Sequence, residues 1–180
     1  TDIPAFYSEW FMNRIREEYF YKVNPFNKNQ VKGISLAPKD VDAIVFWSKY
    51  PKPMLSHLKE LNEKGYNYYF QYTMNNYPEI LEPNLPKLSK RIDVFKELSS
   101  KTSPNQVVWR YDPIIYSNIT PINFHLEKFE NIASKINDYT ERVVISFLDI
   151  YGKTKRKLKK LLKDNDIKFK DIVDYNDKLV

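Results

Sequence analysis

Short apolar runs alternate along this chain with amphipathic stretches that repeat at helical spacing, and this alternation constrains the fold more than any other feature. The strand-like runs lie at residues 43–47, 66–73, 106–112 and 142–148. Helical patterns fill the three intervals between them, at residues 51–65, 88–98 and 120–136. Only three glycines and few hairpin signals argue against a meander of antiparallel strands. Such alternation is typical of parallel strands joined by right-handed crossovers, so the sequence predicts an α/β fold.

Further elements are predicted outside this repeat. Apolar residues at helical spacing predict a helix over residues 6–18, and a basic helix is expected over residues 153–163. Residues 19–23 and 33–36 are strand-like and are separated by a break at residues 24–27. Thr120 followed by Pro121 is typical of a helix N-cap and a first-turn proline.

Bulk properties exclude several classes of protein. A length of 180 residues suits a single domain, and no apolar run approaches the ~20 residues that a membrane span needs. Charged residues interrupt the first fifteen positions, which argues against a signal peptide. The absence of cysteine excludes disulfides and thiolate metal sites within these residues. A cytoplasmic location is the expectation.

Common catalytic motifs are also missing. The chain contains no P-loop, no Rossmann glycine motif and no G-x-S-x-G elbow. His57 and His125 do not stand at the spacing of a metal motif such as H-E-x-x-H, so both are interpreted as structural, with His57 at the surface.

Each predicted strand becomes polar toward its carboxyl end, where parallel α/β folds bind their ligands. This position predicts a pocket for substrate or cofactor. Its candidate residues are Asp2, Trp47, Lys49, Gln71, Thr73, Arg110, Asp112, Ser146 and Asp149.

Arg110 and Asp112 are the most informative pair, because they interrupt the apolar run "VVWRYDPII". The period of two along a strand places both on one face, while Trp109 and Tyr111 face the other way. Since an unpaired buried charge costs several kcal/mol, each of the two needs a partner. Either they pair with a bound ligand, or they pair with each other as an internal ion pair, which would close one end of the sheet if it formed a barrel.

Other candidates also have a structural interpretation. Asp2 is either a strand-end site residue or a turn or cap residue. Lys49 is either an anion ligand or a solvent-exposed lysine. Trp47 either stacks on a ligand or belongs to the core. The segment from Lys153 to Lys170 holds nine Lys/Arg and two Asp, a local charge of +7 within a total of +6. It would contact a nucleic-acid backbone, or form a solvated amphipathic helix anchored by its leucines.

Six stretches carry a resemblance that spans nearly all of residues 1–155: "TDIPAFYSEWFMNRI", "NPFN", "DAIVFWSKYPKP", "YYFQYT", "VVWRYDPII" and "ERVVISFLDIYGKT". In this order they resemble a bacterial family, domain-of-unknown-function family eighteen-forty-eight. That family looks related to radical-SAM TIM-barrel proteins of the spore photoproduct lyase group. The resemblance implies a partial TIM-like (β/α) barrel over residues 1–180 and, in a complete protein, a [4Fe–4S] cluster and S-adenosylmethionine.

The chain departs from the family pattern in two ways. It lacks the family's upstream strand and its cysteine-rich stretch, and 180 residues are few for a closed (β/α)8 barrel. We therefore expect a fragment of a longer protein that is inactive by itself.

Three hypotheses about function follow. The favoured one is the barrel portion of a radical-SAM-like enzyme of unknown substrate. The second is a hydrolase that binds Mg²⁺ or Mn²⁺ through Asp2, Asp112 and Asp149. The third is a non-enzymatic nucleic-acid-binding module that uses residues 153–170.

Overall fold

The computed structural model describes residues 2–148 and 167–169. Its main feature is a four-stranded parallel sheet with the strand order β3-β4-β5-β6. The strands are β3 (Ile44–Ser48), β4 (Tyr68–Thr73), β5 (Val107–Ile114) and β6 (Val143–Phe147). The helices α3 (Leu58–Glu63), α4 (Leu88–Lys101) and α5 (Ile122–Ile136) connect successive strands. The predicted α/β fold is confirmed.

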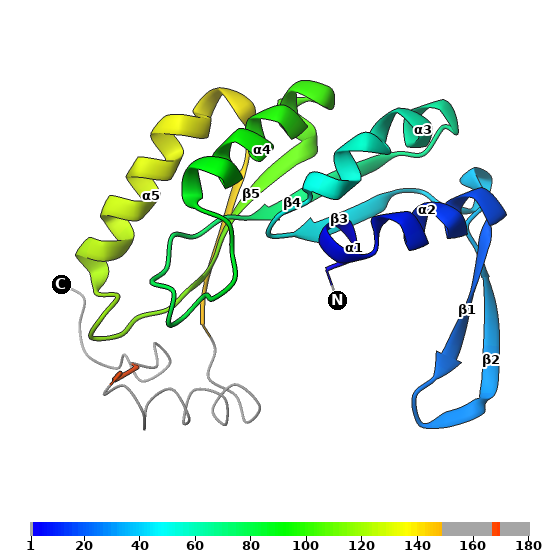
Figure 1. Ribbon diagram of the computed structural model, residues 1–180, viewed down its shortest axis with the longest axis horizontal. Coiled ribbons are helices and arrows are strands. Elements are labelled where there is room, and N and C mark those ends of the chain that lie inside the picture. The colour runs from blue at the N-terminus through cyan, green and yellow to red at the C-terminus, as the bar shows by residue number, and fades with distance from the viewer. Residues whose placement is uncertain (1, 149–166, 170–180) are drawn as a thin grey trace.

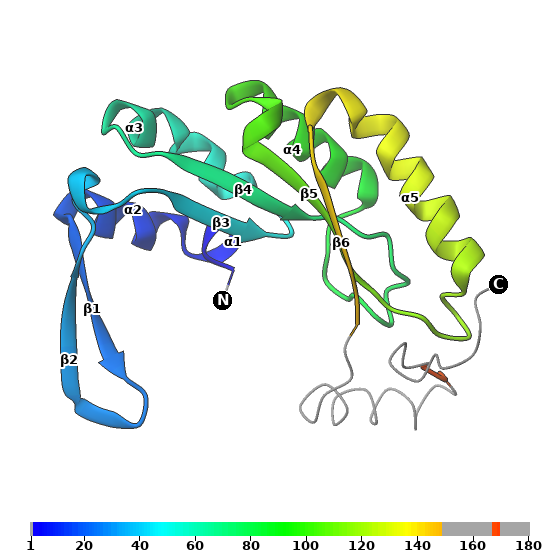
Figure 2. The same cartoon turned by 180° about the vertical axis from the view of Figure 1, so that it is seen from behind.

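All three connecting helices lie on the same face of this sheet (Figures 1 and 2). The sheet is open: β3 and β6 are its edges, and no sheet within residues 2–148 closes into a barrel. The structure therefore shows parallel strands alternating with helices, but not the TIM barrel itself.

Alternation along the strands explains why the helices cover one face. Phe46, Phe70, Tyr72, Trp109 and Tyr111 all point toward the helices and are buried. Aromatic packing is tight in this layer: the rings of Phe46 and Phe70 stack with centroids 4.8 Å apart, and those of Trp109 and Phe129 at 4.7 Å. Each fully buried side chain of this size stabilises the fold by roughly 2 kcal/mol. On the other face of the sheet, no helix or strand among residues 2–148 forms a covering layer.

The amino-terminal helix differs from its prediction. In place of one helix over residues 6–18, the chain forms α1 (Ile3–Phe6) and α2 (Ser8–Glu17), separated at Tyr7. The cause is Asp2, whose carboxylate accepts a hydrogen bond from the Ala5 amide at 3.0 Å and starts a helix earlier than the apolar spacing indicates.

The strand-like segments at residues 19–23 and 33–36 belong to an antiparallel hairpin, β1 (Tyr19–Asn24) and β2 (Asn27–Ser35). Asparagine side chains build its turn. Asn24 accepts a hydrogen bond from the Phe26 amide at 2.9 Å, and Asn27 accepts one from the Asn29 amide at 3.1 Å. The turn signal is therefore present in the sequence, but it lies in asparagines rather than in an Asn-Gly pair.

The helix that follows Pro51 is split into a 3-10 turn, Lys52–Ser56, and α3. The prediction that Thr120 caps a helix is wrong, because α5 begins at Ile122, after Pro121, and no side chain caps its amino end. The Thr120 hydroxyl instead donates to the Ile115 carbonyl at 2.6 Å. The basic helix predicted at residues 153–163 lies outside the described residues.

Candidate functional site

Six of the nine predicted site residues form one polar cluster on the uncovered face of the sheet, toward its carboxyl edge. They are Trp47, Gln71, Thr73, Arg110, Asp112 and Ser146. Neighbouring strands supply them because residues paired in register share a face: Trp47 lies opposite Gln71, and Thr73 opposite Arg110. We call this group the Arg110 cluster.

Arg110 is held at the centre of the cluster. Its Nε donates to Asp112 Oδ2 at 3.0 Å, Nη2 donates to the same oxygen, and Nη1 donates to Gln71 Oε1 at 2.5 Å. The side chains of Arg110 and Asp112 are only 13% and 14% exposed. The predicted ion pair thus exists, and a neighbouring strand adds a third hydrogen bond that fixes the guanidinium in position.

A guanidinium carries five N–H donors, and the hydrogen bonds above use three of those of Arg110. The other two, on Nη1 and Nη2, have no acceptor among residues 2–148 and 167–169. They provide fixed donors for an oxygen atom of a ligand.

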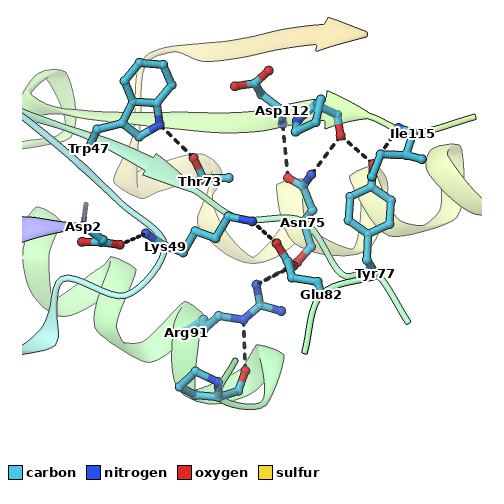
Figure 3. A network of polar contacts seen from close by, with 12 residues as sticks. Asp2, Trp47, Lys49, Thr73, Asn75, Tyr77, Glu82, Arg91, Asp112 and Ile115 are labelled. Atoms are coloured by element: carbon cyan, nitrogen blue, oxygen red, sulfur yellow. Dashed lines mark hydrogen bonds and ion pairs between the residues drawn. The ribbon is translucent and has the colours of Figure 1, made fainter. Parts of the chain in front are cut away.

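Trp47 covers one side of the guanidinium, whose Cζ lies 4.1 Å from the ring centroid. The indole Nε1 donates to Thr73 Oγ1 at 3.2 Å, which fixes the plane of the ring (Figure 3). Trp47 remains 54% exposed. It is therefore not a core residue but an oriented aromatic surface beside Arg110.

Asp112 is hydrogen-bonded on both sides, to β6 and to the segment that follows β4. Ser146 of β6 donates to Asp112 Oδ1, and the Asp112 amide donates to Asn75 Oδ1 at 3.2 Å. Asn75 also donates to the Pro113 carbonyl, which accepts a second hydrogen bond from the Tyr77 hydroxyl at 2.6 Å (Figure 3). Burial raises the pKa of Tyr77, so its hydroxyl stays protonated and keeps donating.

Asn75 and Tyr77 were not among the site residues predicted from the sequence. Continuing the period of two beyond Gln71 and Thr73 would have found both, since the same parity leads to residues 75 and 77.

Asp2 and Lys49 form a second group at the end of β3. Asp2 Oδ2 accepts hydrogen bonds from Ser48 Oγ at 2.9 Å and from the Lys49 amide at 3.1 Å, while Oδ1 caps α1. The structure therefore places Asp2 as a cap residue that also anchors α1 to the sheet.

A chain of charges runs from Lys49 into the loop between β4 and α4. Lys49 pairs with Glu82, and Glu82 Oε2 lies 3.9 Å from Arg91 Nη1 (Figure 3). Arg91 also donates to the carbonyls of Asn75 at 2.8 Å and Pro86 at 3.1 Å. Burial lowers the pKa of Arg91, and the carboxylate of Glu82 opposes that shift.

Glu82 and Arg91 line an open cavity of about 280 Å³ formed by this loop, together with Tyr77 and Lys87. Asn75 connects this cavity to the Arg110 cluster, because its carbonyl accepts from Arg91 and its side chain accepts from the Asp112 amide. Glu82 was not predicted because no periodic pattern runs through the proline-rich loop, and Arg91 was not predicted because a charged residue in a predicted helix gives no sign that it is buried.

A metal centre is not assembled by the described residues. No group of three or more His, Asp or Glu side chains that could hold a metal ion occurs in residues 2–148 and 167–169. Asp2 and Asp112 belong to separate hydrogen-bond groups, and Asp149 lies outside the described residues. The Mg²⁺ or Mn²⁺ site stays a prediction.

The sequence itself shows whether this chain can supply the cysteine ligands of an iron–sulfur cluster. The chain contains no cysteine, so it supplies no thiolate ligand and does not fit such a cluster through its own cysteines. Most of the basic segment, residues 153–170, lies outside the described residues, and its contact with nucleic acid also stays a prediction.

No described helix is long and apolar enough to cross a lipid bilayer. No curated protein and no solved structure matches the chain significantly. A family model described as a domain of unknown function, DUF1848, matches residues 1–179, and the chain therefore belongs to that family.

Proposed function

We propose that this chain is the ligand-binding part of a (β/α)-barrel enzyme, whose site for a small polar molecule is built around Arg110 at the carboxyl ends of β3 to β6. The observation that carries the proposal is the guanidinium itself. It is nearly buried, fixed by two strands and a tryptophan, and still has two unused N–H donors within the described part of the chain. A carboxylate, phosphate or carbonyl oxygen of the ligand would accept from them.

The arrangement of the sheet supports the barrel. A sequential strand order with every crossover helix on one face is the pattern of a (β/α) barrel, whereas doubly wound sheets carry helices on both faces. On the helix-side face of β6, Val143, Ile145 and Phe147 are exposed, which is where the next helix of a barrel would pack. The uncovered face would then point into the barrel interior.

The anion site can be tested with three proteins: the native chain, Arg110→Gln and Arg142→Gln. Arg142 is the matched control, because it is exposed and precedes β6 at the amino end of the sheet. Thermal unfolding is followed with inorganic phosphate, acetate and malonate. We expect at least one of these anions to stabilise the native chain and Arg142→Gln more than Arg110→Gln. Equal stabilisation of all three proteins would contradict the proposal.

For the reaction, we keep the radical-SAM-like chemistry that the resemblance implies, with cluster ligands supplied from outside these 180 residues. The test is to express the complete parent reading frame anaerobically and to assay bound iron and acid-labile sulfide. Stoichiometric amounts of both support this reaction. If neither is found, the radical reaction is abandoned, while the Arg110 site stands or falls by the anion experiment.

A further inference from the structure

The β1–β2 hairpin projects from the rest of the molecule as a two-stranded ribbon (Figures 1 and 2). Residues 19–35 include three lysines, Lys22, Lys28 and Lys32, and no aspartate or glutamate. The ribbon therefore carries a local charge of +3 with no internal neutralisation. Residues 1–148 outside it are not basic overall, so this charge is concentrated in one element.

The aromatic side chains on one face of the ribbon pack against one another and against the rest of the chain. The rings of Tyr19 and Tyr21 meet edge to face at 5.3 Å, and the Arg14 guanidinium lies 5.9 Å over Tyr19. Tyr21 also lies against Gly33 on the opposite strand. This aromatic face is stabilised from within the chain and needs no partner to account for it.

The lysines of the ribbon have no comparable contacts within the described residues. Lys22 and Lys32 lie directly across from each other in the antiparallel register. Like charges in that position destabilise a sheet. None of the three lysines has a hydrogen bond or an ion pair to any residue in the part of the chain that the structure describes. In the same ribbon, Asn24 donates to Gln30 at 2.7 Å.

We propose that this lysine face binds the phosphate backbone of double-stranded DNA, with the ribbon lying in the major groove. A two-stranded ribbon has the width that the major groove admits. Phosphates on the two sides of the groove would neutralise the opposed lysines, which removes their mutual repulsion in the complex. The ammonium groups give affinity, while Asn24 and Gln30 are of the residue types that contact base edges.

The composition of the turn favours nucleic acid over a lipid surface. Phe26 is 97% exposed, but it is the only aromatic side chain in a turn of asparagines and a proline. An interfacial anchor combines basic residues with a continuous apolar face that enters the bilayer boundary. In such an anchor the basic residues occupy the opposite face. Here the face opposite Lys22 and Lys32 pairs Tyr19 with Ser35 and Tyr21 with Gly33, so it is not continuously apolar.

The test is fluorescence anisotropy with a short labelled DNA duplex of mixed sequence, titrated with the full chain over a series of salt concentrations. The variant Lys22→Gln/Lys28→Gln/Lys32→Gln should bind more weakly. The slope of log K against log salt should fall in magnitude by about 3, since each phosphate-contacting lysine accounts for about 1. The matched control is Lys59→Gln/Lys90→Gln/Lys101→Gln, which removes the same charge from exposed positions on α3 and α4. It should keep the native slope.

Three outcomes would overturn the proposal. The first is an equal change in both triple variants, which would show a general effect of net charge. The second is binding that is unaffected in the hairpin variant but lost when the lysines of residues 153–170 are replaced. The third is a hairpin variant that loses binding to phosphatidylserine vesicles while its DNA binding is unaltered. Circular dichroism of each variant confirms that the exposed substitutions leave the fold intact.

Discussion

Arg91 carries a charge that is almost completely enclosed, with only 5% of its side chain exposed. From α4, its guanidinium joins the two ends of the loop between β4 and α4 through the Asn75 and Pro86 carbonyls. We expect Arg91→Ala to lower the free energy of unfolding by about 3 kcal/mol, because buried acceptors lose their donor. Urea denaturation measures this change. The neighbouring Lys90→Ala is exposed and should shift stability by less than about 0.5 kcal/mol. Equal losses would mean that the buried contacts of Arg91 contribute nothing.

His125 gives the fold a defined pH dependence. Its Nε2 lies 2.9 Å from the Ile115 carbonyl, to which it donates, and its Nδ1 accepts from the Tyr111 hydroxyl at 3.1 Å. Burial raises the pKa of Tyr111 to about 12, so that hydroxyl remains a donor at neutral pH. Burial lowers the pKa of His125 below 6.5, and two backbone hydrogen bonds only partly oppose the shift.

Because the unfolded chain then binds the proton more readily, stability is complete above pH 6.5 and declines as the pH falls below that value. We expect denaturation midpoints of the native chain to fall on acidification through this window. His125→Gln should lose that part of the decline, whereas His57→Gln should keep it. A decline that persisted unchanged in His125→Gln would assign the pH dependence to other groups.

At this scale the sequence predicted what depends on strand geometry alone. The shared face of Arg110 and Asp112 follows from the period of two, and their pairing from the cost of burying a charge. The contacts of Glu82 and Arg91 could not be predicted, because they depend on the path of an irregular loop. His57 was predicted at the surface, yet its side chain is only 11% exposed beside Glu9. Its enclosure depends on how α2 packs, which is a tertiary contact.

Among the elements, α3 ends at a position that requires glycine. Gly65 has a φ of +80°, in the left-handed region that side chains disfavour, and it stands just after the helix, where glycine is the preferred residue. Gly65→Ala should lower the free energy of unfolding by roughly 1 kcal/mol. Gly33→Ala is the control, since a Cβ there would meet Tyr21 at an ordinary 3.6 Å. Thermal unfolding of both variants tests the difference, and equal stabilities would refute it.

The elements of the parallel sheet were predictable because burial on the helix side selects long apolar runs. The hairpin was predicted only in part: residues 19–23 and 33–36 were expected to be strand-like, but most of β2 was not, because it contains mostly polar residues and is exposed along almost its whole length. A strand without a buried face has no hydrophobic alternation to detect. Its pairing with β1 is visible only once the asparagine turn is recognised.

For the whole molecule, the open edge at β6 has a measurable consequence. β4 is hydrogen-bonded to strands on both sides, whereas β6 has a neighbour on one side only among the described strands. We expect amide hydrogen exchange to be faster in residues 143–147 than in residues 68–73 of this chain. In the complete parent reading frame, a barrel that continues beyond β6 should slow exchange in residues 143–147. Equal exchange there in both proteins would contradict the proposed barrel.

Whether the sheet continues into a closed barrel cannot be predicted from the alternation of strands and helices. Alternating strands and helices occur in open and in closed sheets, and only the strands beyond an edge decide between them. The placement of all three connecting helices on one face supports the proposed barrel, and it depends on the handedness and order of the crossovers rather than on composition.

The division of β5 between two faces also limits how this family can vary in length. Arg110 and Asp112 alternate with Trp109 and Tyr111 along one strand, so a single insertion or deletion upstream of Trp109 within β5 would exchange the two sets. Two charges would enter the aromatic layer, and two large rings would turn into the site. We therefore expect alignments of family members to show no gaps across residues 107–112, and to place their length differences in segments such as residues 76–87.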